Sequence, residues 1–287
     1  MFSPGAPINQ YKLFAGRIEL VGDVVRAINQ RGQHVILYGE RGVGKTSLAN
    51  VMKEILETNI TIVKINCDTE DNFNSIWQKI FREIVITFKT RGMGFNSEDN
   101  KKNISLNEFL ENGKDIHPED IRYFLEIYPG VLVIIIDEID RIKDTRTTTL
   151  MADTIKTLSD HSLSSTLVLI GVSDSVEGLI QEHLSIERAL VQVRMPRMSP
   201  EELSEILDKG YSELNLTIED SLKRKIVQLS QNLPHYTHLL GLHAAETAIH
   251  HDRDYIISED VQEAIREAIE KAQQTIISTY NTAIYSP

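Results

Sequence analysis

The feature that most constrains the fold of this chain is a glycine-rich segment, GERGVGKT, at 39–46. It matches the pattern G-x-x-x-x-G-K-[ST], follows the apolar run HVILY at 34–38, and leads into a helix-forming segment at 46–57. Its glycines allow the backbone to turn with positive φ and to approach an anion closely. Successive N–H groups at the start of a helix then face that anion. We therefore expect a phosphate-binding loop between a strand and a helix.

Each position of this loop has an expected role toward ATP. Lys45 is predicted to place its charge on the β and γ phosphates, and the Thr46 hydroxyl to bind Mg²⁺. The other residues are expected to surround the phosphates; they are Gly39, Glu40, Arg41, Gly42, Val43, Gly44 and Ser47. The alternative is a chance match, which the preceding strand and following helix make improbable.

A second motif is acidic and follows a buried strand, in VLVIIIDEID at 131–140. Ligands of open α/β sheets bind at the carboxyl ends of the strands, which is where these carboxylates are expected. We predict that Asp137 holds Mg²⁺, directly or through water, and that Glu138 is the base that orients and deprotonates the attacking water. The alternative is a strand that ends in a solvated acidic turn.

The order of the elements predicts the fold class. Strands alternate with helices over 33–195, which indicates an α/β fold with a parallel sheet sandwiched by helices, as in P-loop NTPases. From Ser199 the pattern is helix only, and Ser199-Pro200-Glu201-Glu202 has the form of a helix-starting capping box. We expect a nucleotide-binding domain at 1–197 and a small all-helical lid domain at 198–287.

One internal region departs from the alternation. After an expected amphipathic helix at 73–89, residues 90–117 form a polar excursion for which we predict at most one short helix, near 105–111. Candidate nucleic-acid contacts are basic residues in this region and in the lid, namely Lys89, Arg91, Lys101, Lys102, Lys223, Arg224 and Lys225. The alternative is that they are solvated charges balancing an acidic chain.

Composition limits the other possibilities. The formal charge of −12 is not typical of proteins whose main role is to bind nucleic acid. Cys67 is the only cysteine, so no disulfide framework or cysteine-based metal site is expected. The histidines between 235 and 251 are interpreted as packing or solvated side chains rather than metal ligands. No apolar run is long enough to cross a bilayer and no signal peptide is recognisable, so a cytoplasmic protein is expected.

Taken together, these motifs resemble the AAA+ ATPases, and most of all their replication-initiator and origin-recognition branch with its bacterial relatives. The resemblance runs from about 13 to 272, and the DEID motif at 137–140 is similar to the acidic motif of that branch. LFAGRIEL at 13–20 resembles the box that helps enclose the adenine. By this resemblance, Gly16 and Arg17 belong to the nucleotide site.

The resemblance also implies roles for residues nearer the carboxyl terminus. LIGVSDS resembles the strand that carries the first sensor, which gives Ser173 a contact to the γ phosphate or the attacking water. SIERAL resembles the segment of the arginine finger, which gives that role to Arg188; a plain surface arginine is the alternative, with Arg194 and Arg197 as substitutes. In the lid, His235 stands where the family has a second sensor arginine.

Three functions are compatible with these features. The first is an ATPase whose nucleotide-dependent assembly acts as a motor or switch on nucleic acid, as the resemblance implies. The second is an ATP-dependent assembly switch that controls a partner effector protein, for example in bacterial defence. The third, a protein-remodelling chaperone, is disfavoured because we find no aromatic-hydrophobic-glycine pore signature. An arginine finger supplied in trans implies a homo-oligomer.

Overall fold

The computed structural model describes residues 2–56, 60–90, 100–109, 114–173 and 186–270. The chain divides into two compact units. The first, here called the sheet unit, comprises Glu19–Glu40 and Leu56–Met195. The second, here called the helical unit, comprises Met1–Ile18, Arg41–Ile55 and Pro196–Pro287.

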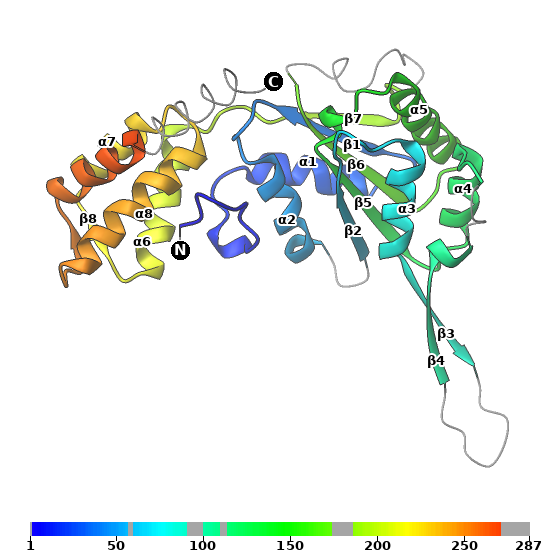
Figure 1. The fold of residues 1–287 in the computed structure, drawn as a ribbon, viewed down its shortest axis with the longest axis horizontal. Coiled ribbons are helices and arrows are strands. Elements are labelled where there is room, and N and C mark those ends of the chain that lie inside the picture. Colours follow the sequence, from blue (N-terminus) through cyan, green and yellow to red (C-terminus); the bar gives the residue numbers. More distant parts are fainter. Residues whose placement is uncertain (1, 57–59, 91–99, 110–113, 174–185, 271–287) are drawn as a thin grey trace, which may run out of the picture. The chain divides into compact units, whose positions relative to one another are not determined.

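A five-stranded parallel sheet forms the centre of the sheet unit (Figure 1). In chain order its strands are β1 (His34–Gly39), β2 (Ile60–Asn66), β5 (Val131–Asp137), β6 (Ser165–Val172) and β7 (Leu190–Arg194). Their order across the sheet is β2-β5-β6-β1-β7, and every pairing is parallel. This arrangement confirms the predicted fold class, and it brings the carboxyl ends of all five strands to one edge.

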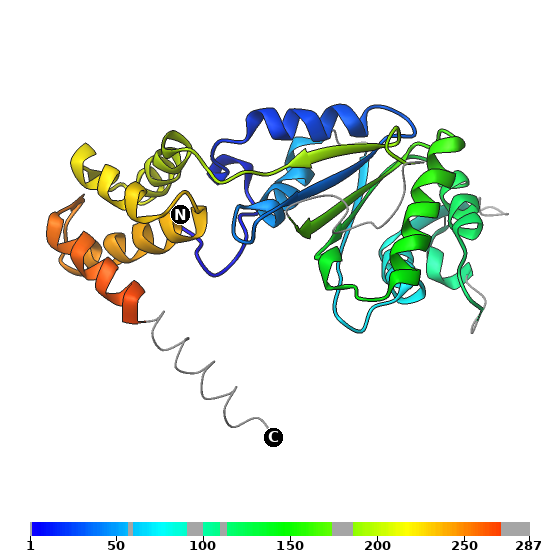
Figure 2. The same ribbon diagram turned by 90° about the horizontal axis from the view of Figure 1, so that it is seen from above.

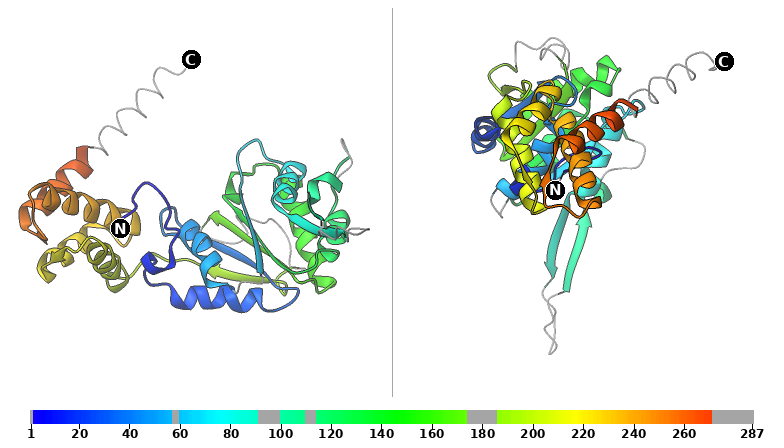
Figure 3. Two further views of the ribbon diagram at one scale, coloured as in Figure 1. Left: turned by 90° about the horizontal axis from the view of Figure 1, so that it is seen from below. Right: turned by 90° about the vertical axis from the view of Figure 1, so that its left-hand side faces the viewer.

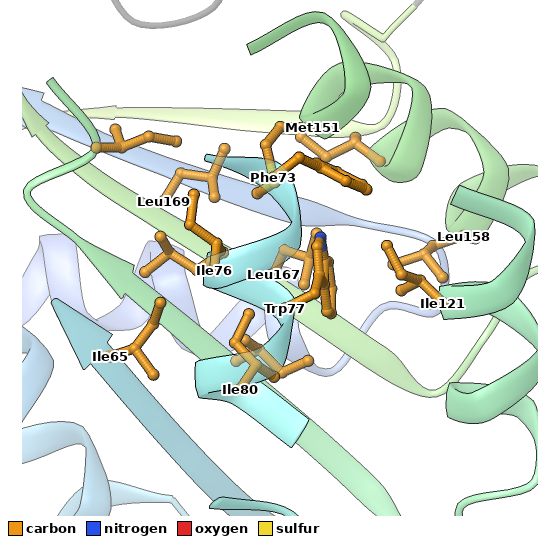
Figure 4. Close-up of a cluster of buried hydrophobic side chains, with 14 of the residues drawn as sticks. Ile65, Phe73, Ile76, Trp77, Ile80, Ile121, Met151, Leu158, Leu167 and Leu169 are labelled. Atoms are coloured by element: carbon orange, nitrogen blue, oxygen red, sulfur yellow. The ribbon is translucent and has the colours of Figure 1, made fainter. Parts of the chain in front are cut away.

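One face of the sheet packs against α3 (Phe73–Glu83), α4 (Pro118–Glu126) and α5 (Thr145–Asp160). Trp77 of α3 is fully buried among aliphatic side chains from the sheet and from α4 and α5 (Figure 4). Trp77 is therefore a core residue of the sheet unit. The helix α1 (Ile18–Ile28) lies on the opposite face (Figure 2).

The polar excursion differs from its prediction. The helix α3 ends at Glu83, and the chain then forms an antiparallel hairpin of β3 (Val85–Thr90) and β4 (Asn100–Ser105) that extends from the sheet unit (Figure 3). The short 3-10 helix η2 (Leu106–Phe109) lies within the predicted helical range. The helix predicted to continue to residue 89 was wrong because the run V-I-T-F-K favours a strand, and Leu106 N–H closes the hairpin base on the Ile84 carbonyl at 2.9 Å.

The helical unit contains α2 (Lys45–Ile55), the 3-10 helix η1 (Tyr11–Leu13), α6 (Pro200–Glu213), α7 (Asp220–Leu229), α8 (Pro234–His250) and a helix over 258–270. The predicted capping box is present: Glu202 N–H donates to Ser199 Oγ at 3.2 Å, and Ser199 N–H donates to a Glu202 carboxylate oxygen at 2.8 Å.

The region after Ser199 is mainly helical, as predicted, and the structure adds a short parallel pair of β8 (Thr217–Ile218) with β9 (Tyr255–Ile256). Strands of two residues are too short to show an alternating pattern in the sequence. A further predicted helix, at 175–182, lies outside the described residues. None of the described helices is both long enough and apolar enough to span a membrane.

Candidate functional site

The phosphate loop has the backbone geometry that its glycines were expected to allow. Gly39 ends β1 with φ 151°, and Gly42 and Gly44 follow with φ 84° and 100°. A Cβ on Gly39 would lie 2.4 Å from the carbonyl oxygen of Met195, so a side chain has no room there. Lys45 begins α2 and is only 7% exposed. The loop therefore combines three glycines at positive φ with a largely buried lysine.

The amino-terminal segment runs along the helix that the loop begins. Ile8 N–H donates to Ser47 Oγ at 3.1 Å, and Tyr11 N–H donates to a carboxylate oxygen of Glu54 at 2.8 Å. Both acceptors are on α2. The Ser47 hydroxyl therefore has a structural partner within the helical unit, next to Thr46.

At the end of β5, Asp137 is 3% exposed. One of its oxygens, Oδ1, accepts a hydrogen bond from Glu138 N–H at 2.9 Å. The other, Oδ2, accepts none from the described residues, and it lies 3.2 Å from the ammonium of Lys64 on β2. A buried carboxylate oxygen that lacks a hydrogen bond is suited to a cation, and Lys64 supplies positive charge there.

Glu138 lies in a left-handed backbone conformation, with φ 59° and ψ 37°. It precedes the 3-10 turn η3 (Ile139–Arg141), whose Ile139 is 1% exposed and packs in the core of the sheet unit. A carboxylate oxygen of Glu138 lies 3.3 Å from Arg141 Nη1, and both side chains are about half exposed. The predicted base is thus accessible to solvent, and the buried side chain of Ile139 holds its turn against the core.

A carboxylate also connects this turn to β6. Val172 N–H donates to Asp140 Oδ1 at 2.8 Å, and Ser173 is the next residue along the chain. The structure therefore brings Asp137, Glu138 and Ser173 to the same edge of the sheet unit. The phosphate loop starts at this edge too, since Gly39 pairs with Val172 in the register of β1 and β6.

The sequence reasoning missed Lys64, Asp140 and Arg141 as parts of this edge. A signal existed for Lys64, because it is a lone charge inside the apolar run TIVKINC. Asp140 is the last residue of the acidic motif and Arg141 follows it, but their partners depend on the path of the turn and on the neighbouring strand. No spacing rule predicts those partners.

Gly16 and Arg17 are held within the helical unit. Gly16 N–H donates to a carboxylate oxygen of Glu205 at 2.9 Å, and Arg17 Nη2 donates to the Pro196 carbonyl at 2.6 Å. Arg17 is 6% exposed; burial lowers the pKa of its guanidinium, and the nearby Glu202 carboxylate opposes that shift. Both residues have positive φ, 61° and 62°. They are linked to α6 and to the residue Pro196 that precedes it.

The remaining predicted residues lie elsewhere. His235 is exposed, and its Nδ1 lies 3.1 Å from the Pro4 carbonyl oxygen within the helical unit. Arg188 is also exposed and precedes β7, so it lies near the amino end of the strands. That is the sheet edge opposite to Glu138. The structure does not bring Arg188 to the acidic turn of its own sheet unit.

A strand that ends in this glycine loop, with buried and exposed carboxylates at the end of a parallel neighbour, defines a P-loop NTPase. Residues 28–180 match the family model described as AAA domain. Because the match covers more than half of the chain, the chain belongs to this family of nucleotide-binding ATPases. The resemblance to AAA+ proteins inferred from the sequence is thereby confirmed.

Solved structures agree on the fold. The chain is similar to the RuvB Holliday junction branch migration motor of Thermotoga maritima, with a TM-score of 0.53, 18% identity, and coverage of 95% of this chain and 80% of that one. A Walker-type ATPase of Pyrococcus abyssi gives 0.67 and 16%, covering 97% and 78%. The ORC1 protein of Aeropyrum pernix, in complex with DNA, gives 0.59 and 18%, covering 93% and 66%. The comparison with curated proteins finds no match.

Proposed function

We propose that this chain is a Mg²⁺-dependent ATPase whose nucleotide-dependent assembly acts as a motor or switch on nucleic acid. The observation that carries the ATPase activity is the shared carboxyl edge of the sheet. There β1 ends in the phosphate loop and β5 ends in Asp137 and Glu138, with β6 paired between them. Residues 1–197 are the nucleotide-binding domain in this proposal, and 198–287 are the lid.

Nucleotide binding is assigned to the loop and to the start of the chain. Backbone N–H groups of 39–47 surround the phosphates, and the Lys45 ammonium neutralises the β and γ phosphates. Gly16 and Arg17 support the pocket for the adenine. His235 is the lid residue assigned to the nucleotide, as a weaker substitute for an arginine.

Thr46 and Asp137 are the residues that would hold Mg²⁺. The structure offers it a suitable ligand, because Asp137 Oδ2 is buried without a hydrogen bond from the described residues. When bound, the ion neutralises negative charge that develops on the phosphate oxygens. Lys64 provides part of the countercharge for Asp137 in this structure, at 3.2 Å.

Hydrolysis is assigned to the acidic turn. Glu138 takes a proton from a water molecule whose oxygen attacks the γ phosphorus in line. The bond from phosphorus to the β-γ bridging oxygen breaks, which gives ADP and inorganic phosphate. Ser173 orients the water or the γ phosphate, and Arg188 of a neighbouring subunit stabilises the developing charge. The position of Arg188 at the opposite sheet edge from Glu138 supports a role in trans, and therefore a homo-oligomer.

The β3–β4 hairpin supports nucleic acid as the partner. Its two strands contain no acidic residue, in a chain with a net charge of −12, and their register sets Lys89 opposite Lys101. A basic segment in an acidic chain is a local site of attraction for phosphate groups. A two-stranded ribbon also fits the major groove of duplex DNA. Two of the similar structures carry nucleic-acid roles in their names, a branch migration motor and a complex with DNA.

The test measures particle mass and DNA binding together. With Mg·ATP the particle is expected to be larger than with ADP, and to bind a fluorescent duplex about tenfold more weakly at 200 mM than at 50 mM salt if two phosphates are contacted. Lys101→Glu/Lys102→Glu is expected to abolish this binding. The control Arg224→Glu/Lys225→Glu makes the same change in charge on exposed residues of α7 and is expected to bind within about twofold of the wild type.

Two results would change the proposal. Loss of binding in the α7 variant alone would move the nucleic-acid contact to the lid. ATP-dependent assembly without DNA binding at any salt concentration would instead favour the switch that controls a partner effector protein.

A further inference from the structure

The ladder between β5 and β6 ends before the two strands do. Paired residues run from Leu132 with Ser165 to Ile136 with Leu169. Beyond Leu169, β6 continues for three residues that pair with β1, up to Val172 opposite Gly39. The acidic turn and the end of β6 are therefore not joined by strand pairing at the point where Glu138 and Ser173 lie.

The Asp140 carboxylate spans this interruption. Its Oδ1 accepts the hydrogen bond of Val172 N–H at 2.8 Å, a bond to a charged acceptor. Asp140 is exposed, while its neighbour Ile139 is buried in the core. The turn is thus held in two ways: Ile139 is buried in the core, and Asp140 accepts a hydrogen bond from β6.

We propose that Asp140 is a positioning residue, which holds the end of β6, and with it Ser173, at a fixed place relative to Glu138. This inference rests on the proposed ATPase function and on the role of Glu138 within it. It assigns to Asp140 the hydrogen bond to Val172 N–H, a role separate from those proposed for Asp137 as metal ligand and for Glu138 as base.

The physical reason is that the hydrogen bonds within the turn do not fix the position of Glu138 relative to β6. Its left-handed conformation is held by the turn η3, in which Arg141 N–H donates to the Glu138 carbonyl at 3.0 Å and Ile142 N–H to the Ile139 carbonyl at 3.1 Å. Both bonds lie within the turn, so neither sets its distance from β6. A misplacement of about 1 Å in a reacting group can reduce the rate about a hundredfold.

A structural role alone predicts a different result from a positioning role. Asp140 lies at the surface, and in its absence water can satisfy the Val172 N–H, so the fold should survive its removal. Positioning predicts that turnover falls while nucleotide affinity stays. It also predicts that an acceptor oxygen is sufficient, so that Asp140→Asn should restore what Asp140→Ala loses.

The experiment compares Asp140→Ala, Asp140→Asn and Glu138→Gln with the wild type in steady-state turnover, in Mg·ATP affinity and in hydrogen exchange of a peptide over 165–173. Asp140→Ala is expected to lower kcat by about ten- to a hundredfold, to leave the Kd for ATP within about twofold, and to speed exchange of the Val172 amide. Asp140→Asn is expected to recover kcat to within about threefold of the wild type, because it keeps Oδ1.

Two outcomes would overturn the proposal. One is a kcat within twofold of the wild type for Asp140→Ala while Glu138→Gln is inactive, which would leave the ATPase proposal intact. The other is Asp140→Asn as slow as Asp140→Ala despite a protected Val172 amide, which would mean that the charge and not the bond matters. Normal turnover in Glu138→Gln would instead show failure of the proposed base itself.

Discussion

Two turns at the carboxyl edge of the same sheet are built by opposite means. The turn after β1 has glycines with positive φ at 39, 42 and 44, and Gly39 has no space for a side chain. The turn after β5 contains no glycine, yet it places Glu138 at φ 59°, a conformation that costs a non-glycine residue about 1–2 kcal/mol. In the first turn, glycines allow the backbone N–H groups to approach an anion, as the proposed function requires. In the second turn, a strained backbone conformation at Glu138 presents the carboxylate of that residue.

This difference explains why the second turn needs external support. Burial of Ile139 and the bond from Val172 to Asp140 fix the position of a turn whose conformation Glu138 alone would not favour. The comparison predicts that changes in the first turn affect nucleotide binding, while changes in the second affect turnover. Residues outside both turns provide ways to test how complete that division is.

The largest expected effect concerns a residue in neither turn. Arg188→Ala should lower turnover by about a thousandfold, as expected for an arginine finger, while the ATP affinity of a single subunit stays close to that of the wild type. Specific activity of the wild-type protein should rise with protein concentration as subunits assemble. Turnover of Arg188→Ala at the wild-type rate would move the finger to Arg194 or Arg197.

A smaller effect tests the glycine turn. Gly39→Ala adds a Cβ that meets the Met195 carbonyl oxygen at 2.4 Å, in a backbone conformation that alanine rarely adopts. We expect a loss of about 3 kcal/mol in the free energy of unfolding, and loss of ATP binding. Gly42→Ala is the matched control, because its Cβ meets no described atom within 4 Å. Equal losses of stability and of ATP binding in the two variants would show that backbone strain, and not the clash with Met195, is responsible.

A further prediction is that stability depends on pH, in part through His34, which lies at the end of β1 opposite to the phosphate loop. Burial lowers the pKa of His34, at the start of β1, to about 4, and it does the same for His238 in α8. Between pH 6.5 and 4 the unfolded chain binds protons that the folded chain does not. The free energy of unfolding should therefore fall as the pH is lowered from 6.5 to 4, by roughly 3 kcal/mol per histidine.

Urea denaturation at a series of pH values measures this fall. His34→Gln should reduce its slope, whereas His250→Gln, a change at an exposed position, should leave the slope as in the wild type. A slope that His34→Gln leaves unchanged would mean that other groups cause the acid sensitivity.

The two turns also differ in how far the sequence predicts them. The glycine loop and the strand at 131–137 follow from local patterns, and both appear where expected. The positions of Lys64 and Asp140 relative to their partners depend on which strands are neighbours, which local patterns do not contain. The β3–β4 hairpin was missed because the apolar residues of α3 continue past Glu83 at spacings that also fit a helix. The hydrogen bond from Leu106 N–H to the Ile84 carbonyl, a tertiary contact, favours the strand over the helix.

The most direct test compares Lys45→Ala with Glu138→Gln in the same two assays, melting temperature with and without Mg·ATP and turnover at saturating ATP. Ligand at a hundredfold excess over its Kd stabilises a protein by about 2.7 kcal/mol. We predict that Lys45→Ala loses this stabilisation and turnover together. Glu138→Gln should keep the stabilisation and turn over at least about a hundredfold more slowly than the wild type. Equal stabilisation of wild type and Lys45→Ala, or wild-type turnover by Glu138→Gln, would contradict the division of binding and hydrolysis between the two turns.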